Sequence, residues 1–176
     1  MARKKGQVWI ETVIYTMIAF TLIATVLAFV KPKIEEMQDE TTITRSLVIM
    51  KDIDSTISNV LNGGQGNRRL IEIEIKKGTI NIQGIEDKIS FEILSKAKYS
   101  EPGMDVFDGN IKINTIEKTR ENLITLERAY NSSKYNITYN KMDINKQLTP
   151  GNLAYKVFIS NRGTENNKTI IDLEVQ

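Results

Sequence analysis

The sequence predicts an α+β protein in which a long N-terminal helix, transmembrane and then amphipathic, precedes an antiparallel β-sandwich domain. The first observation behind this class is an apolar run over residues 12–30 without Asp, Glu, Lys, Arg, Pro or Gly. The second is a helical spacing of apolar residues over 33–61, and the third is a period of two from residue 69 onward. A length of 176 residues suits one domain with appendages better than two full domains.

The apolar run is long enough to cross a membrane. Extended back to Val8 it carries one charged residue, Glu11, and at 1.5 Å per residue it spans roughly 35 Å. A basic cluster precedes it, formed by Arg3, Lys4 and Lys5. Short basic flanks stay in the cytoplasm, which predicts a cytoplasmic N-terminus and an extracellular C-terminal domain, although Lys31 and Lys33 argue weakly for the reverse. A secretory signal peptide fits less well, because no small-x-small cleavage site follows the run.

Residues 32–62 are predicted to continue the helix as an amphipathic segment. Its apolar stripe consists of Ile43, Leu47, Met50, Ile57 and Val60. Asp54 occupies the position that this spacing skips. Ile34, Met37 and Thr41 are expected to extend the stripe toward the N-terminus with the same helical spacing. Pro32 is expected to kink or interrupt the join to the transmembrane segment.

A Gly-rich linker, residues 63–68, is predicted to end the helix, since glycine permits the left-handed backbone of a helix C-cap. The sandwich domain is assigned to residues 69–176, where short alternating runs are separated by turn residues. Residues 101–105 are expected to form a loop. Seven or eight strands are expected, with candidates at 70–75, 79–82, 88–94, 110–116, 122–128, 135–139, 153–160 and 168–175.

The composition excludes several classes of function. Without Cys and His, the chain has no disulfide, no thiolate or imidazole metal ligand, and no histidine-based triad. A formal charge of +2 does not mark a nucleic-acid-binding protein. The spacing of Asp105, Asp108 and Asn110 fits no EF-hand pattern. We therefore predict no enzymatic activity, no metal site, no cofactor and no nucleic-acid partner.

The segment around Glu11 carries the most specific motif. A basic cluster, then Gly6 and Gln7, then Glu11 and the apolar run resembles the class III signal peptide of type IV pilin-like proteins, especially archaeal ones. The resemblance implies that a prepilin peptidase cuts between Gly6 and Gln7, which leaves Glu11 as the fifth residue of the mature chain. The chain departs from the family at Trp9, where many archaeal members carry a serine. An indole there is also typical of an interfacial membrane anchor.

Physical chemistry supports the motif. A glycine beside the scissile bond lets an extended backbone enter a protease cleft. Cleavage creates a cationic amino terminus, which Glu11 of the same or a neighbouring subunit can neutralise in a low-dielectric core. A buried pair of this kind can set the register of subunit stacking.

The resemblance implies a structural subunit. Residues 1–6 would be the leader peptide and residues 7–31 the transmembrane and filament-core helix. The mature protein would self-associate into an extracellular helical filament for adhesion or motility, and its partners would be the membrane, the prepilin peptidase and the pilus assembly machinery. Three alternatives stay open: an uncleaved single-pass membrane protein (an archaellum stator-like component or a surface receptor), a minor pilin or pseudopilin, and a secreted binding module.

Three N-x-[ST] sequons lie in the predicted β domain, at Asn131, Asn136 and Asn167. All three are on the side predicted to be extracellular, and proteins of the pilin family are often N-glycosylated. Since Asn136 falls within a predicted strand, its side chain must face outward if it carries a glycan.

Overall fold

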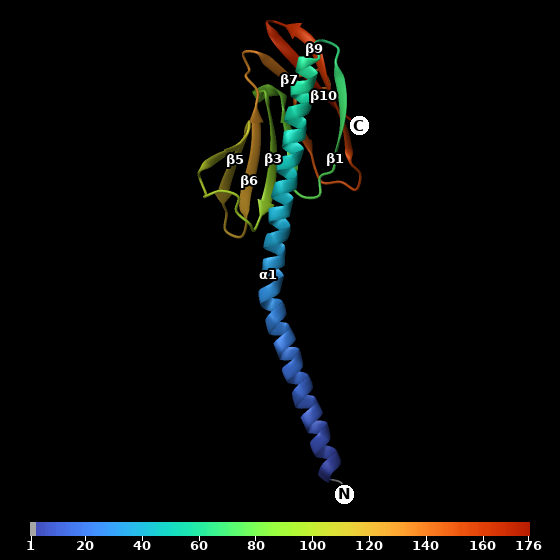
Figure 1. The fold of residues 1–176 in the computed structure, drawn as a ribbon, viewed down its shortest axis with the longest axis vertical. Coiled ribbons are helices and arrows are strands. Elements are labelled where there is room, and N and C mark those ends of the chain that lie inside the picture. Colours follow the sequence, from blue (N-terminus) through green and yellow to red (C-terminus); the bar gives the residue numbers. More distant parts are fainter. Residues whose placement is uncertain (1–2) are drawn as a thin grey trace. The chain divides into compact units, whose positions relative to one another are not determined.

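The computed structural model describes residues 3–176 of the protein, with side chains from Val8 onward. The described residues form one α-helix, α1 (Arg3–Asn62), ten β-strands and one 3-10 turn, η1 (Gly84–Glu86). The chain divides into two compact units. One ends at Gln38, and the other, Asp39–Gln176, contains the rest of α1 and both β-sheets (Figure 1). The predicted α+β class is confirmed.

Helix α1 continues through Pro32. Of the two effects predicted for this proline, a kink or an interruption, the interruption is wrong. Proline removes one main-chain donor, but its fixed φ is close to the helical value, so only a local part of the hydrogen-bond ladder is lost. Strong helix formers follow it, among them Glu35, Glu36 and Met37, and these favour continuation of the helix.

The strands form two sheets. The four-stranded sheet has the order β1-β9-β10-β7, and its strands are β1 (Arg68–Ile73), β9 (Tyr155–Glu165), β10 (Lys168–Val175) and β7 (Tyr135–Tyr139). The six-stranded sheet has the order β4-β5-β6-β3-β2-β8, and its strands are β4 (Asp105–Asp108), β5 (Ile111–Glu117), β6 (Asn122–Ala129), β3 (Lys88–Ser95), β2 (Thr79–Gln83) and β8 (Asn145–Leu148).

All eight candidate strands are present, but the sequence did not reveal the two edge strands β4 and β8. Each is only four residues long. In β4 the two apolar residues, Val106 and Phe107, are adjacent, and β8 has a single apolar residue, Leu148, so neither strand shows an alternation to detect. Nearly all neighbouring strands are antiparallel, as predicted. The prediction is wrong for β7 and β10, which pair in parallel. After β7 the chain adds β8 to the other sheet and β9 to this one, and these intervening elements provide the long connection that a parallel pair requires.

The core joins α1 to both sheets in one hydrophobic cluster. All five predicted stripe residues are buried, and Ile53 joins them. The strands contribute mainly alternating isoleucines, such as Ile80 and Ile82 of β2, together with Phe91 of β3. In Figure 1 this part of α1 is flanked by β3, β5 and β6 on one side and by β1, β9 and β10 on the other.

The buried stripe begins at Ile43 and not at Ile34. Ile34 and Met37 are 47% and 59% exposed, so the expectation that they continue the stripe is wrong. Ile43 is nine positions after Ile34, which is two and a half turns of a regular helix. Side chains with that spacing leave the helix on opposite sides, so the two apolar groups cannot share a face.

Loss of core volume along α1 should destabilise the β unit. We expect Ile57→Ala to lower the free energy of unfolding by about 2–5 kcal/mol, because the fully buried side chain leaves a cavity. Urea titration of the detergent-solubilised full chain, read by pulse proteolysis, measures the change. Val48→Ala is the matched control, since Val48 is on the same helix but 52% exposed. Equal urea midpoints for the two variants would contradict the proposed packing.

Candidate functional site

The first candidate is the apolar surface of α1 before Lys31. Large apolar side chains are exposed along this stretch, including Val8, Trp9, Ile10, Tyr15, Phe20, Leu22, Leu27 and Phe29. Within the part of the chain that the structure describes, none of the most apolar window is buried. A helix that is apolar all round is normally covered by lipid or by other protein. By length and composition α1 could span a membrane.

The threonine hydroxyl groups within this stretch are satisfied by the helix itself. Thr12 and Thr16 donate from Oγ1 to the carbonyl oxygens four residues earlier, at 2.9 and 2.8 Å. Thr21 and Thr25 do the same at 2.8 Å each. A hydroxyl that is bonded in this way costs little to transfer out of water. The segment therefore needs no polar partner at these four positions.

Glu11 is the only charged residue between Val8 and Val30, and its side chain is exposed on the helix surface. The rest of the sequence motif consists of Arg3, Lys4, Lys5, Gly6 and Gln7. The backbone is helical from Arg3, but the side chains of these five residues lie outside the described residues. Their assigned roles in topology and cleavage stay predictions.

A second polar site lies where α1 meets the six-stranded sheet. Asp54 Oδ1 accepts hydrogen bonds from Arg128 Nε at 2.6 Å and from Tyr130 Oη at 3.2 Å, and Oδ2 accepts one from Asn110 Nδ2 at 3.2 Å. The Arg128 guanidinium also lies 4.7 Å from the centre of the Tyr130 ring. Burial and then the Asp54 charge raise the pKa of Tyr130, which is only 7% exposed. These contacts orient α1 on the sheet.

Two further carboxylates fasten α1 to the β unit. Asp39 is buried and accepts from Lys77 Nζ at 2.5 Å and from the main-chain nitrogen of Lys96 at 2.7 Å. Lys51 Nζ lies 2.8 Å from a carboxylate oxygen of Asp108 at the end of β4. Both contacts join residues far apart in sequence, so neither has a local sequence signal.

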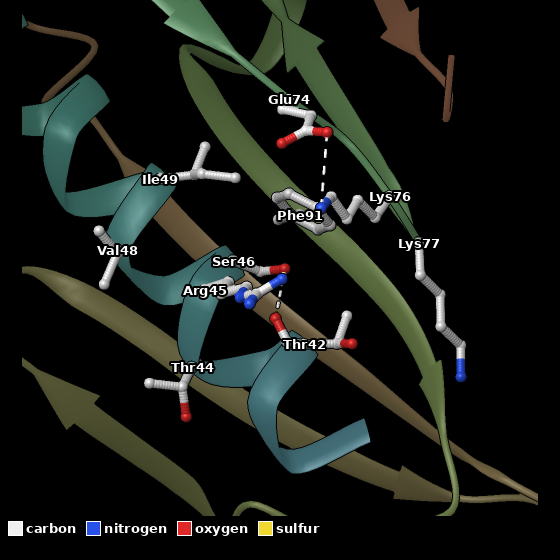
Figure 2. A pocket seen from close by; sticks show the side chains of 10 residues that line it. All are labelled: Thr42, Thr44, Arg45, Ser46, Val48, Ile49, Glu74, Lys76, Lys77 and Phe91. Atoms are coloured by element: carbon white, nitrogen blue, oxygen red, sulfur yellow. Dashed lines mark hydrogen bonds and ion pairs between the residues drawn. The ribbon is translucent and has the colours of Figure 1, made fainter. Parts of the chain in front are cut away.

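A groove of about 510 Å³ runs beside α1 (Figure 2). Ile49 of α1 and Phe91 of β3 give it an apolar floor, and Val48 stands on the helix side. Arg45 and Lys76 lie at its rim, where Lys76 Nζ is 3.6 Å from a carboxylate oxygen of Glu74. Ile49 also borders a smaller hollow of about 290 Å³ between α1 and β1. The groove thus combines an apolar floor with a charged rim.

The three sequons gather around the start of β7. The main-chain nitrogen of Tyr135 donates to the carbonyl of Asn131 at 2.9 Å, and Asn136 is in register with Ile170 of β10, whose strand begins directly after Asn167. Asn131 and Asn167 are exposed. Asn136 is half-buried, and its amide nitrogen donates to Asp143 Oδ1 at 2.9 Å.

Three further carboxylates, those of Asp105, Asp172 and Asp87, accept hydrogen bonds within the β unit. Asp105 accepts from Asn114 Nδ2 at 2.8 Å, and Asp172 is fully buried, where it accepts from Thr138 Oγ1 and the Lys141 nitrogen, each at 2.7 Å. Buried Asp87 accepts from the Ile137 nitrogen at 2.8 Å. Among the described residues, no group of three or more acidic side chains is arranged to hold a metal ion.

No protein-family model, curated protein or solved structure matches the chain. The candidate sites therefore depend on the motif and the geometry alone. The sequence pointed to Asp54, because a carboxylate interrupts an apolar stripe. It did not identify Arg128 and Tyr130 as the residues that hydrogen-bond this carboxylate. It offered no signal for Asp39 or for the groove.

The buried phenol should make stability fall in alkali. Above about pH 10 the unfolded Tyr130 ionises while the native phenol keeps its proton, so the free energy of unfolding falls as pH rises. Tyr130→Phe should be less stable near neutrality, because one hydrogen bond to Asp54 is lost, but should lose less additional stability between about pH 9 and pH 11. Urea midpoints at several pH values measure both effects. The same alkaline slope for wild type and variant would contradict the assignment.

Proposed function

We propose that the protein is a type IV pilin-like structural subunit. Residues 8–30 would hold the precursor in the membrane with the β unit, folded as a sandwich, outside the cell. A prepilin peptidase would cut after Gly6, and the mature chain would assemble through its N-terminal helix into a filament for adhesion or motility. The observation that carries the proposal is the exposed, uniformly apolar surface of α1 directly behind the Gly6–Glu11 motif.

The exposed surface supplies a driving force for assembly. In the precursor, lipid would cover about twenty apolar side chains, and in the filament the helices of neighbouring subunits would replace the lipid. Packing between helices is then decided by van der Waals contact and by polar groups. A contact that does not close on itself repeats without limit, which yields a helical filament.

Glu11 would set the register of this packing. After cleavage the amino group of Gln7 is one helical turn from Glu11, and the two charges can pair within a subunit or across neighbours. The helical backbone around Glu11 and its exposed side chain are compatible with either arrangement.

The sequons fit an outward-facing β unit. Asn131 and Asn167 are exposed and are the stronger candidates for N-glycosylation. Asn136 is the weaker one, because its amide nitrogen is engaged by Asp143. A glycan on either exposed residue would project from the region around the start of β7.

An uncleaved single-pass membrane protein is the second candidate. Trp9 favours it, because this large side chain is 71% exposed beside the predicted cleavage site and is suited to a membrane interface. In that case the same apolar helix would stay a permanent anchor. Cleavage separates the two candidates.

Processing is the direct test of the proposal. We expect the protein isolated from its native membrane or cell surface to begin at Gln7, by intact mass and N-terminal sequencing, with added mass if a sequon is occupied. Gly6→Val should block the cut on steric grounds, whereas Gly6→Ala should be affected less. A native product that keeps Arg3, Lys4 and Lys5 would instead establish a permanent anchor.

The role of Glu11 is testable apart from processing. We expect Glu11→Ala to be cleaved normally but to lower the yield of filaments sheared from cells by about tenfold or more, because the amino terminus loses its counter-charge in a low-dielectric core. Glu11→Asp, which keeps the charge on a shorter side chain, should recover part of the yield. Unchanged yield from Glu11→Ala would remove the electrostatic register argument.

A further inference from the structure

We propose that a hollow beside β7 is a carbohydrate-binding site and that its occupant is the glycan carried by Asn167 of the same chain. This β7 hollow has a volume of about 490 Å³ and is lined by residues of η1, β7, β9, β10 and the chain between them, among them Ile85, Asp87, Asn136, Asp143, Glu165 and Lys168. The inference rests on the N-glycosylation proposed for the outward-facing β unit. It adds the place on the fold where the first sugars are held.

Asn167 lies at the rim of the β7 hollow. The two residues beside it in the chain, Asn166 and Lys168, both line the hollow. Asn166 and Asn167 form the turn between β9 and β10, with φ angles of 48° and 64°. Positive φ at both residues is what a two-residue hairpin turn of this kind requires, and asparagine tolerates it. The turn therefore fixes the attachment point one residue from the hollow, so the glycan begins at its rim.

The sequon at Asn136 forms part of the wall. Asn136 lines the β7 hollow, and its Nδ2 donates to Asp143 Oδ1 at 2.9 Å. The hydroxyl group of the same sequon belongs to Thr138, which is buried and donates to Asp172 Oδ1 at 2.7 Å. Because both polar side chains of this sequon are engaged by the fold, we assign Asn136 to sugar binding and Asn167 to sugar attachment.

Acceptor atoms in the β7 hollow have unused capacity. Asp87 is only 6% exposed, and its Oδ1 accepts from the main-chain nitrogen of Ile137 at 2.8 Å. Within the described part of the chain, no hydrogen bond reaches Asp87 Oδ2, Asp143 Oδ2 or Asn136 Oδ1. A nearly buried carboxylate oxygen is stabilised by a donor. The hydroxyl groups of a sugar are donors of the required kind.

The rest of the lining defines the class of sugar. Ile85 is 70% exposed, and with Ile170 it offers aliphatic surface to the C–H face of a sugar ring. The charged lining residues are three carboxylates, those of Asp87, Asp143 and Glu165, and one amine, that of Lys168. This excess of negative charge favours a neutral sugar over an acidic one. The volume is within the range of about 300–1,000 Å³ that is usual for small-ligand pockets.

Thiol labelling tests the contact, because the native chain contains no cysteine. The full chain carrying Ile85→Cys is produced in the native cells, and its rate of reaction with N-ethylmaleimide is followed by intact mass. Thr169→Val removes the sequon but leaves Asn167 in its turn. We expect this second change to speed labelling about tenfold, which corresponds to a hollow occupied for about nine-tenths of the time in the glycosylated chain. Thr169→Ser keeps the sequon and should leave the rate unchanged, as should Ser133→Ala, which removes the sequon at Asn131.

The possible outcomes separate this contact from the proposed function. Peptide mass mapping that finds no glycan on Asn167, or equal labelling rates with and without the sequon, would overturn the contact. Faster labelling from Ser133→Ala alone would assign the hollow to the Asn131 glycan and overturn it as well, and so would protection that requires an added free saccharide such as galactose. The pilin proposal stands or falls separately, on whether the same purified chain begins at Gln7.

Discussion

The β unit depends on the burial of one face of α1 against two sheets. Six apolar side chains between Ile43 and Val60 enter a core that both sheets share. At about 1.5–3 kcal/mol for each large apolar side chain, their removal from water is a major part of what holds the unit together. Asp54 lies within the same stripe, and burial of its carboxylate is tolerable because Arg128, Tyr130 and Asn110 hydrogen-bond it. Apolar burial thus supplies most of the stability of this packing, and the hydrogen bonds of the carboxylate fix the orientation of the helix on the six-stranded sheet.

One helix serves two different environments. From Asp39 onward α1 is amphipathic, and its apolar side is covered by strands of the same chain. Over residues 8–30 its only charged residue is Glu11, large apolar side chains dominate the rest, and its threonines bond to their own helix. That stretch has no one-sided apolar stripe of the kind that packs on the β unit, and a surface that is apolar on all sides is suited to lipid or to other apolar helices.

The topology arranges the surfaces that face outward. Parallel pairing of β7 and β10 brings Asn131, Asn136 and Asn167 to one region, although the first and last of these are far apart in sequence. The groove is formed elsewhere, where Thr42 to Ile49 of α1 pass the chain between β1 and β2. Each surface is built from residues that no single motif links.

The sequence by itself determined the apolar segment, the stripe from Ile43 to Val60, the eight strands with clear alternation, and the motif around Gly6 and Glu11. These are local patterns, because periodicity and charge are read over one or two turns or one strand. Tertiary structure alone decided the parallel β7–β10 pair, the edge strands β4 and β8, the partners of Asp39 and Asp54, and the groove at Phe91. Each of these depends on contacts between distant segments, which four-residue strands and single carboxylates do not encode locally. Pro32 shows the same limit, since the local rule predicted a kink or an interruption and the helix continues through it.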